Sequence, residues 1–220
     1  MAAETTPRAC WLVSARVNTI LAFGAALVSL RLASDLVRRA RAKRSPELTA
    51  WAASLVAYAA ASAALAAGAA GGWHDATFRV YYLFGGLLTA PLLGVGSLLR
   101  AGFRRAAPLG LIYSGIAVGV AVAMPLTRVV TGTGIPCAQS HLDVFPARVL
   151  AIAGNSLGTL AVVAVAIATL RRRPLGNALI LAGVGVAALG SALTGLGEAG
   201  TSAFFAVAAA LLYGGVVAKR

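Results

Sequence analysis

The sequence has few charged residues, and acidic residues are the scarcest of them. Only 11% of its 220 residues are charged, with six aspartates and glutamates in total, whereas 60% are hydrophobic. A soluble domain normally carries roughly 25% charged residues, so this composition argues against a soluble protein. We therefore expect the solvent of most of the chain to be a lipid bilayer.

Motifs of the common enzyme classes are also missing. The chain has no HExxH, GxSxG, Walker or CxxC motif, which would signal metal, nucleophile, phosphate or redox chemistry. Its two lysines, Lys43 and Lys219, fall at predicted helix ends, so none lies in the core to form a retinal-type Schiff base. No acidic residue falls at mid-depth in a predicted span, which disfavours proton-coupled transport. We expect neither an enzyme nor a cofactor.

Seven apolar runs of about 20 residues dominate what is present, and each can cross a hydrocarbon core roughly 30 Å thick. They cover residues 17–37, 49–70, 80–99, 107–127, 148–170, 176–197 and 202–218. The alanine-rich second run is the weakest, because alanine contributes little to insertion. The sequence predicts an all-α, polytopic integral membrane bundle of seven transmembrane helices, forming a single domain over residues 1–220.

Basic residues gather in every second connection. Thirteen lysines and arginines lie on one side, in RRARAKR, RAGFRR, RRR and the final KR, against five on the other side. Because this bias marks the cytoplasmic side, we expect a cell-membrane protein with its N-terminus outside and its C-terminus in the cytoplasm. The basic residues form no contiguous stripe, so we expect no nucleic-acid partner. A signal peptide is the rival interpretation of the first run, but no A-x-A-like cleavage site follows it.

Arg-Val pairs open the first, third and fifth runs, at Arg16, Arg79 and Arg148. Cations at a helix N-terminus oppose the macrodipole, so these arginines need an anionic neighbour. Lipid phosphates at headgroup depth are the simplest neighbour, and an outer anion site shared by all three arginines is the alternative. The pairs also suggest a repeated helical hairpin, although positive-inside bias and helix-start prolines explain much of the same pattern.

Polar residues inside the apolar runs are few, and they are the candidates for a ligand site or a permeation path. Thr89 and Pro91 lie in the middle of the third run, and Asn155 lies about two turns into the fifth. Pro91 has no N–H to donate to the carbonyl of Leu87, so we expect a kink there. Thr89 can help to satisfy the freed backbone. Both a packed kink and a site at the break fit this pattern.

Two further patterns concern packing inside the bundle. Gly115 with Gly119, and Gly154 with Gly158, form GxxxG pairs, which predict close approach of helix backbones. Arg31 and Asp35 lie one turn apart near the inner end of the first run, so we expect them to pair on one helix face.

The outer connections hold both cysteines and both histidines. Cys10 and Cys137 are candidates for a disulfide, because an extracytoplasmic setting permits one; unpaired thiols are the alternative. His74 and His141 are weak candidates for zinc or copper ligands, because they lie far apart in the sequence without a recognised ligand spacing. Solvated loop histidines are the simpler interpretation, and we expect no metal.

Two kinds of function fit these features. The first is a non-enzymatic sensor or accessory protein that binds a partner membrane protein or an apolar, lipid-like ligand among its helices. The second is a small permease or channel for a neutral or lipid-like solute, with its path near Thr89, Pro91 and Asn155. The core is rich in alanine and glycine and poor in polar groups, which favours the first. A continuous polar cavity joining Thr89 to Asn155 would favour the second.

Overall fold

The computed structural model describes residues 8–172, 174–195 and 201–217, and these residues fold into helices without a β-strand among them. The predicted all-α class is confirmed. The single long helices are α1 (Arg8–Lys43), α2 (Pro46–Gly71), α5 (Ala106–Ala123), α7 (Val149–Ala168), α8 (Pro174–Gly195) and α9 (Thr201–Val217). A further long rod is built from α3 (Asp75–Tyr81), the π-helical segment η1 (Tyr82–Leu88) and α4 (Thr89–Arg100). The short elements are α6 (Ala138–His141), η2 (Val144–Arg148) and the 3-10 turn η3 (Leu170–Arg172).

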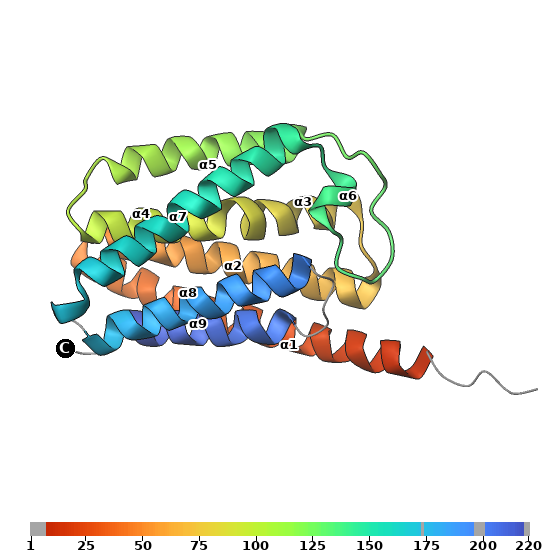
Figure 1. Ribbon diagram of the computed structural model, residues 1–220, viewed down its shortest axis with the longest axis horizontal. Coiled ribbons are helices and arrows are strands. Elements are labelled where there is room, and N and C mark those ends of the chain that lie inside the picture. The colour runs from red at the N-terminus through yellow and green to blue at the C-terminus, as the bar shows by residue number, and fades with distance from the viewer. Residues whose placement is uncertain (1–7, 173, 196–200, 218–220) are drawn as a thin grey trace, which may run out of the picture.

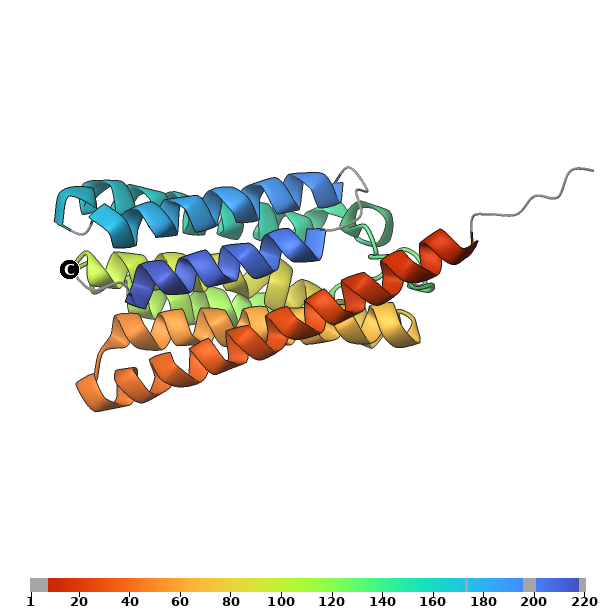
Figure 2. The same cartoon turned by 90° about the horizontal axis from the view of Figure 1, so that it is seen from below.

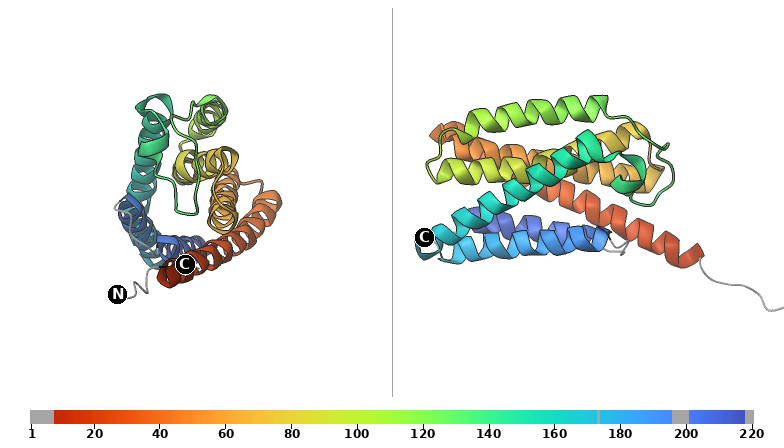
Figure 3. Two further views of the ribbon diagram at one scale, coloured as in Figure 1. Left: turned by 90° about the vertical axis from the view of Figure 1, so that its right-hand side faces the viewer. Right: turned by 45° about the horizontal axis from the view of Figure 1, so that its top comes forward.

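The long helices run side by side and alternate in direction along the longest axis of the molecule (Figures 1 and 2). The α1–α2, α4–α5 and α7–α8 connections therefore lie at one end, and the α2–α3 turn and the loop that carries α6 lie at the other (Figure 1). Seen end-on, α5 lies at one side of the bundle, and α1, α8 and α9 lie at the opposite side (Figure 3). Basic segments occupy the α1–α2, α4–α5 and α7–α8 connections. The end of the bundle that holds these three connections is therefore strongly basic.

Four helical segments among the described residues are long and apolar enough to cross a membrane. They are Pro46–Gly71, Asp75–Arg100, Ala106–Ala123 and Val144–Ala168, and they coincide with the predicted runs 49–70, 80–99, 107–127 and 148–170. The exposed face of α5 carries large apolar side chains such as Leu111 and Val122, as a lipid-facing surface would. These four segments do not establish the predicted count of seven spans or the orientation of the termini.

The corner between α1 and α2 shows how the sequence begins and ends these helices. Arg44 adopts a positive φ of 47° after the end of α1, which turns the chain. Ser45 then caps α2 by accepting a hydrogen bond from the Leu48 amide, and Pro46 fits the first helical turn because its missing N–H needs no partner there. At the other end Gly72, with a φ of 89°, follows α2 in a conformation that favours glycine.

The loop between α5 and α7 folds against the end of the bundle. The Trp73 amide donates to the carbonyl of Gly132 at 2.8 Å, and the Val130 amide donates to the carboxylate of Asp75 at 3.1 Å. Val130 and Leu142 are buried together with Trp73. The loop thus closes one end of the helix core.

Candidate functional site

The break in the third rod lies at the predicted position, and it has a specific hydrogen-bonding pattern. The chain widens into the π-helical η1 just before Pro91. The Thr89 hydroxyl donates to the carbonyl of Phe84 at 2.7 Å, and the Thr89 amide donates to the same oxygen. Thr89 therefore bonds within its own widened turn, and its acceptor is Phe84 O rather than the Leu87 carbonyl that Pro91 leaves without a donor.

Pro91 has no N–H, so one backbone donor is missing at the break. An N–H at position 91 would reach Leu87 O in an α-helix and Gly86 O in a π-helix. The Tyr113 hydroxyl of α5 donates to Leu87 O at 2.9 Å, and Asn155 Nδ2 of α7 donates to Gly86 O at 2.9 Å. Two other helices thus supply side-chain donors to the two carbonyls that an N–H at position 91 could have reached.

A third helix also bonds to this break. The Ser54 hydroxyl of α2 donates to Thr89 O at 2.7 Å. The carbonyls of residues 86, 87 and 89 therefore accept side-chain hydrogen bonds from α7, α5 and α2, respectively. A freed backbone group in a membrane must be satisfied by neighbouring helices, side chains or water, and here side chains do so.

Glycines bring α7 directly onto the break. A Cβ at Gly158 would lie 2.8 Å from Pro91 N, and a Cβ at Gly94 would lie 2.7 Å from the Gly158 Cα. A Cβ at Gly154 would lie 3.1 Å from Pro91 Cγ and would overlap the Tyr113 hydroxyl. The GxxxG pair of α7 therefore makes the close contact predicted for it.

The GxxxG pair of α5 does not make such a contact. A Cβ at Gly115 or Gly119 would meet no atom within 4 Å. The prediction for this pair is wrong for the described chain, because both glycines lie on a part of α5 that no other helix covers.

The arginine at the outer end of α3 contacts protein carbonyls. Arg79 Nη1 lies 2.9 Å from Ala121 O and 3.0 Å from Val122 O, in the last turn of α5. The final carbonyls of a helix lack intrahelical donors and carry partial negative charge. Within the described residues Arg79 thus bonds to carbonyls of partial negative charge at a helix C-terminus.

The other two Arg-Val arginines do not share this position. Arg148 is half-buried at the end of η2. The side chain of Arg16 lies outside the described part of the structure. Arg79 has its own partners in α5, and no contact joins it to Arg148 among the described residues.

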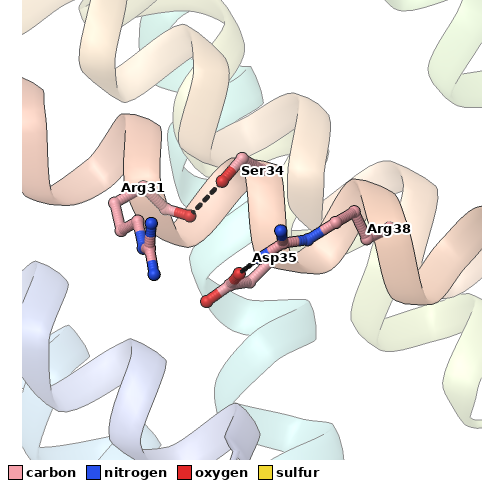
Figure 4. Close-up of polar contacts among 4 residues, drawn as sticks. All are labelled: Arg31, Ser34, Asp35 and Arg38. Carbon is pink, nitrogen blue, oxygen red and sulfur yellow. Dashed lines mark hydrogen bonds and ion pairs between the residues drawn. The ribbon is translucent and has the colours of Figure 1, made fainter.

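The charged cluster near the inner end of α1 pairs differently from the prediction. Asp35 forms its ion pair with Arg38, three residues later, and Arg31 makes no ion pair with it (Figure 4). The Ser34 hydroxyl donates to the carbonyl of Arg31 at 2.6 Å (Figure 4). Both i,i+3 and i,i+4 neighbours share a helix face, and the Arg38 side chain takes the carboxylate.

The candidate disulfide is not found. Cys137 is an exposed free cysteine at the start of α6, and the side chain of Cys10 lies outside the described part of the structure. The first turns of α1, which contain Cys10, extend beyond the other helices, whereas α6 lies against the bundle end (Figure 1). A disulfide needs two Cβ atoms roughly 3.5–4.5 Å apart.

The two histidines occupy different surroundings. His74 is exposed just before α3. The His141 ring packs 5.7 Å from the Phe78 ring, and its Nδ1 lies 3.0 Å from Cys137 O. Within the described residues no group of three or more His, Cys, Asp or Glu could hold a metal ion.

A cavity at the basic end of the bundle was not predicted from the sequence. It has a volume of about 20 Å³, which is room for about one water molecule, and it lies between α2, α4, α7 and α8. Its lining residues are Trp51, Ser97, Arg100, Val162, Val165, Ala166, Thr169, Asn177 and Ile180. The lining combines apolar side chains with a cation, two hydroxyls and an amide.

The polar wall of this cavity is ordered by hydrogen bonds. Asn177 is only 6% exposed, and its Nδ2 donates to the Thr169 hydroxyl at 2.9 Å. Thr169 in turn donates to Val165 O at 2.7 Å. The Arg100 guanidinium lies 5.6 Å from the centre of the Trp51 ring, within the range of a cation–π interaction.

A comparison with protein-family models, curated proteins and solved structures finds no match for this chain. Its function must therefore be argued from the break at Pro91 and from the cavity at the basic end.

Proposed function

We propose that this protein is a seven-span, non-enzymatic protein of the cell membrane that binds a lipid-like ligand or a partner membrane protein through its helix bundle, as a sensor or accessory subunit. Its N-terminus would be outside and its C-terminus in the cytoplasm. The observation that carries the proposal is the bonding of the polar groups at the Pro91 break. They donate to backbone carbonyls, which argues for a packed bundle rather than a solute path.

The alternating direction of the helices supports the proposed topology. Arg41 and Lys43 end α1, Arg100 ends α4, and Arg171 follows α7, so these cations gather at one end of the bundle. The basic side of a membrane protein faces the cytoplasm. Two reporter fusions, one after Arg220 and one within the loop at Gly134, would test this. We expect a cytoplasmic signal from the first and an external signal from the second; the reverse pattern would refute the orientation.

The packing at Pro91 supports binding over transport. A path for a solute needs polar groups that face a passage. Thr89 donates to Phe84 O, Asn155 Nδ2 donates to Gly86 O, and α7 contacts Ala90 and Pro91 without room for a Cβ at Gly158. These side chains hold the helices together, and no solute path is needed to explain their positions.

One atom favours the alternative of a small permease. Asn155 Oδ1 is buried and has no hydrogen-bond partner among the described residues, and such atoms call for an explanation. A passing solute or an ordered water could bond to it. This alternative predicts solute flux that Asn155→Ala abolishes.

Purified protein can separate the two functions. We expect unbiased mass spectrometry to find a lipid class or a protein partner enriched over the surrounding membrane, and reconstituted vesicles to show no protein-dependent flux of neutral solutes. Flux that is lost in Asn155→Ala, with no retained ligand or partner, would refute the binding function and support transport.

A further inference from the structure

The cavity at the basic end of the bundle has the size of a single water molecule. Its volume is about 20 Å³, and a cavity needs about 10–15 Å³ to hold a water. A buried water also needs polar groups of the protein around it, and it typically forms about three hydrogen bonds with them. This cavity brings such groups together from three helices: Ser97 and Arg100 of α4, Thr169 at the end of α7 and Asn177 of α8.

The Thr169 hydroxyl fixes the orientation of the Asn177 amide. Thr169 Oγ1 donates its only hydrogen to Val165 O at 2.7 Å, so towards Asn177 it can only accept. The atom of Asn177 that bonds to it, at 2.9 Å, is therefore the donor Nδ2. The other end of the amide is an oxygen, which only accepts hydrogen bonds. Asn177 thus keeps Oδ1 as an acceptor without a donor among the described residues.

The other polar groups of the cavity add one more acceptor and a donor. Ser97 is 6% exposed, and its hydroxyl donates to Leu93 O at 3.0 Å, which leaves the lone pairs of Oγ unused. Asn177 is also 6% exposed. The Arg100 guanidinium has only donors; it lies over the Trp51 ring and forms no hydrogen bond within the described part of the chain. Two buried acceptors and one cationic donor therefore line the same small space.

This combination selects water over an ion. An anion can only accept hydrogen bonds, and the lone pairs of Ser97 Oγ and Asn177 Oδ1 would repel it. A metal cation would be repelled by the charge of Arg100. A water molecule both donates and accepts, so it can donate to the two oxygens and accept from the guanidinium. Buried polar groups that would otherwise lack partners are the usual setting of an ordered water.

We propose that this cavity is a binding site for one ordered water molecule, which donates to Ser97 Oγ and Asn177 Oδ1 and accepts from Arg100. No side-chain hydrogen bond joins α4 directly to α8 among the residues that the structure describes. The water therefore links these two helices and stabilises the basic end of the bundle. The site does not depend on whether the bundle binds a ligand or passes a solute.

A crystal structure of the full chain, at a resolution that shows ordered waters, tests the site directly. We expect a density peak within about 3.2 Å of Ser97 Oγ, Asn177 Oδ1 and a nitrogen of Arg100. Crystals grown with bromide in place of chloride should give no anomalous peak at this position. A bromide peak would reassign the cavity to an anion, and a cavity without density would be dry; either result would overturn the proposal.

Two matched serine variants test what the water contributes. Ser97→Ala and Ser114→Ala each remove a hydroxyl that bonds to the carbonyl four residues earlier in its own helix, but Ser114 does not line the cavity. Ser97→Ala should therefore lower Tm more than Ser114→Ala does, and it should weaken or displace the density peak. Equal Tm values with an unchanged peak would overturn the link between α4 and α8. The wild-type crystal structure decides the occupancy even where a variant fails to fold.

Discussion

The Arg79 guanidinium on α3 lies 2.9 Å from the carbonyl oxygen of Ala121 in the last turn of α5. This contact joins the start of one rod to the end of the next rod along the chain. It explains why an arginine stands at the entrance of an apolar segment, because its charge compensates a helix terminus of the protein itself.

Removal of the Arg79 guanidinium should destabilise the outer end of the bundle. Arg79→Gln is expected to lower the free energy of unfolding by about 1 kcal/mol, since a partly buried cation at a helix C-terminus contributes up to about 2 kcal/mol. Unfolding in mixed micelles would measure the change. Arg128→Gln, at an exposed loop position, is the matched control, and equal effects of the two variants would contradict the capping role.

Loss of the Tyr113 hydroxyl should weaken the contact of α5 with the Pro91 break. Tyr113→Phe removes the donor to Leu87 O and should lower the free energy of unfolding by about 1 kcal/mol, because a carbonyl is left unpaired. Ser114→Ala is the control, since its hydroxyl bonds within α5 to Gly110 O. A Tyr113→Phe variant as stable as Ser114→Ala would show that Leu87 O finds another donor.

A methyl group at Gly158 should push α7 away from the break. Gly158→Ala places a Cβ 2.8 Å from Pro91 N, and such overpacking typically costs about 1–3 kcal/mol. Gly119→Ala should be neutral or slightly stabilising, because its Cβ meets no atom within 4 Å and alanine is the better helix former. Comparison of the two Tm values tests whether Gly158 lies on a packed face and Gly119 on an open one. A larger decrease in Tm for Gly119→Ala than for Gly158→Ala would contradict this assignment.

The Cys137 thiol should react with reagents added outside the cell. It is exposed at the start of α6 and free, so a membrane-impermeant maleimide should label the Cys10→Ser variant in intact cells. A cysteine introduced at Ala101, an exposed residue at the basic end, should react only after lysis when Cys10 and Cys137 are replaced by serine. Labelling of the Ala101 position alone in intact cells would invert the proposed topology.

Local patterns in the sequence predicted the elements better than the contacts between them. The apolar runs predicted α2, α5 and α7 to within a few residues, because span length and helix-ending residues are properties of a single segment. The defect at Pro91 was predicted for the same reason. Its donors Tyr113 and Asn155 were not assigned to it, because that pairing depends on how α5 and α7 are rotated in the bundle.

The rotation of the helices, which no single segment encodes, also explains the predictions that were wrong. The GxxxG pairs of α5 and α7 are identical as patterns, yet only the pair in α7 meets another backbone. Arg38 competes with Arg31 for Asp35, and spacing permits either pair. Trp51, Arg100 and Asn177 line one cavity from three helices, so nothing in any one of these segments indicated it.

The three side-chain bonds to residues 86–89 have a consequence for the depth of the helices in the membrane. Sliding the third rod by one turn, about 5.4 Å, would separate Gly86, Leu87 and Thr89 from their partners on α7, α5 and α2 at the same time. The break therefore fixes the vertical register of four rods against one another. That register also keeps Trp51 of α2 level with Arg100 of α4, so a contact at the basic end of the bundle depends on a defect in its middle.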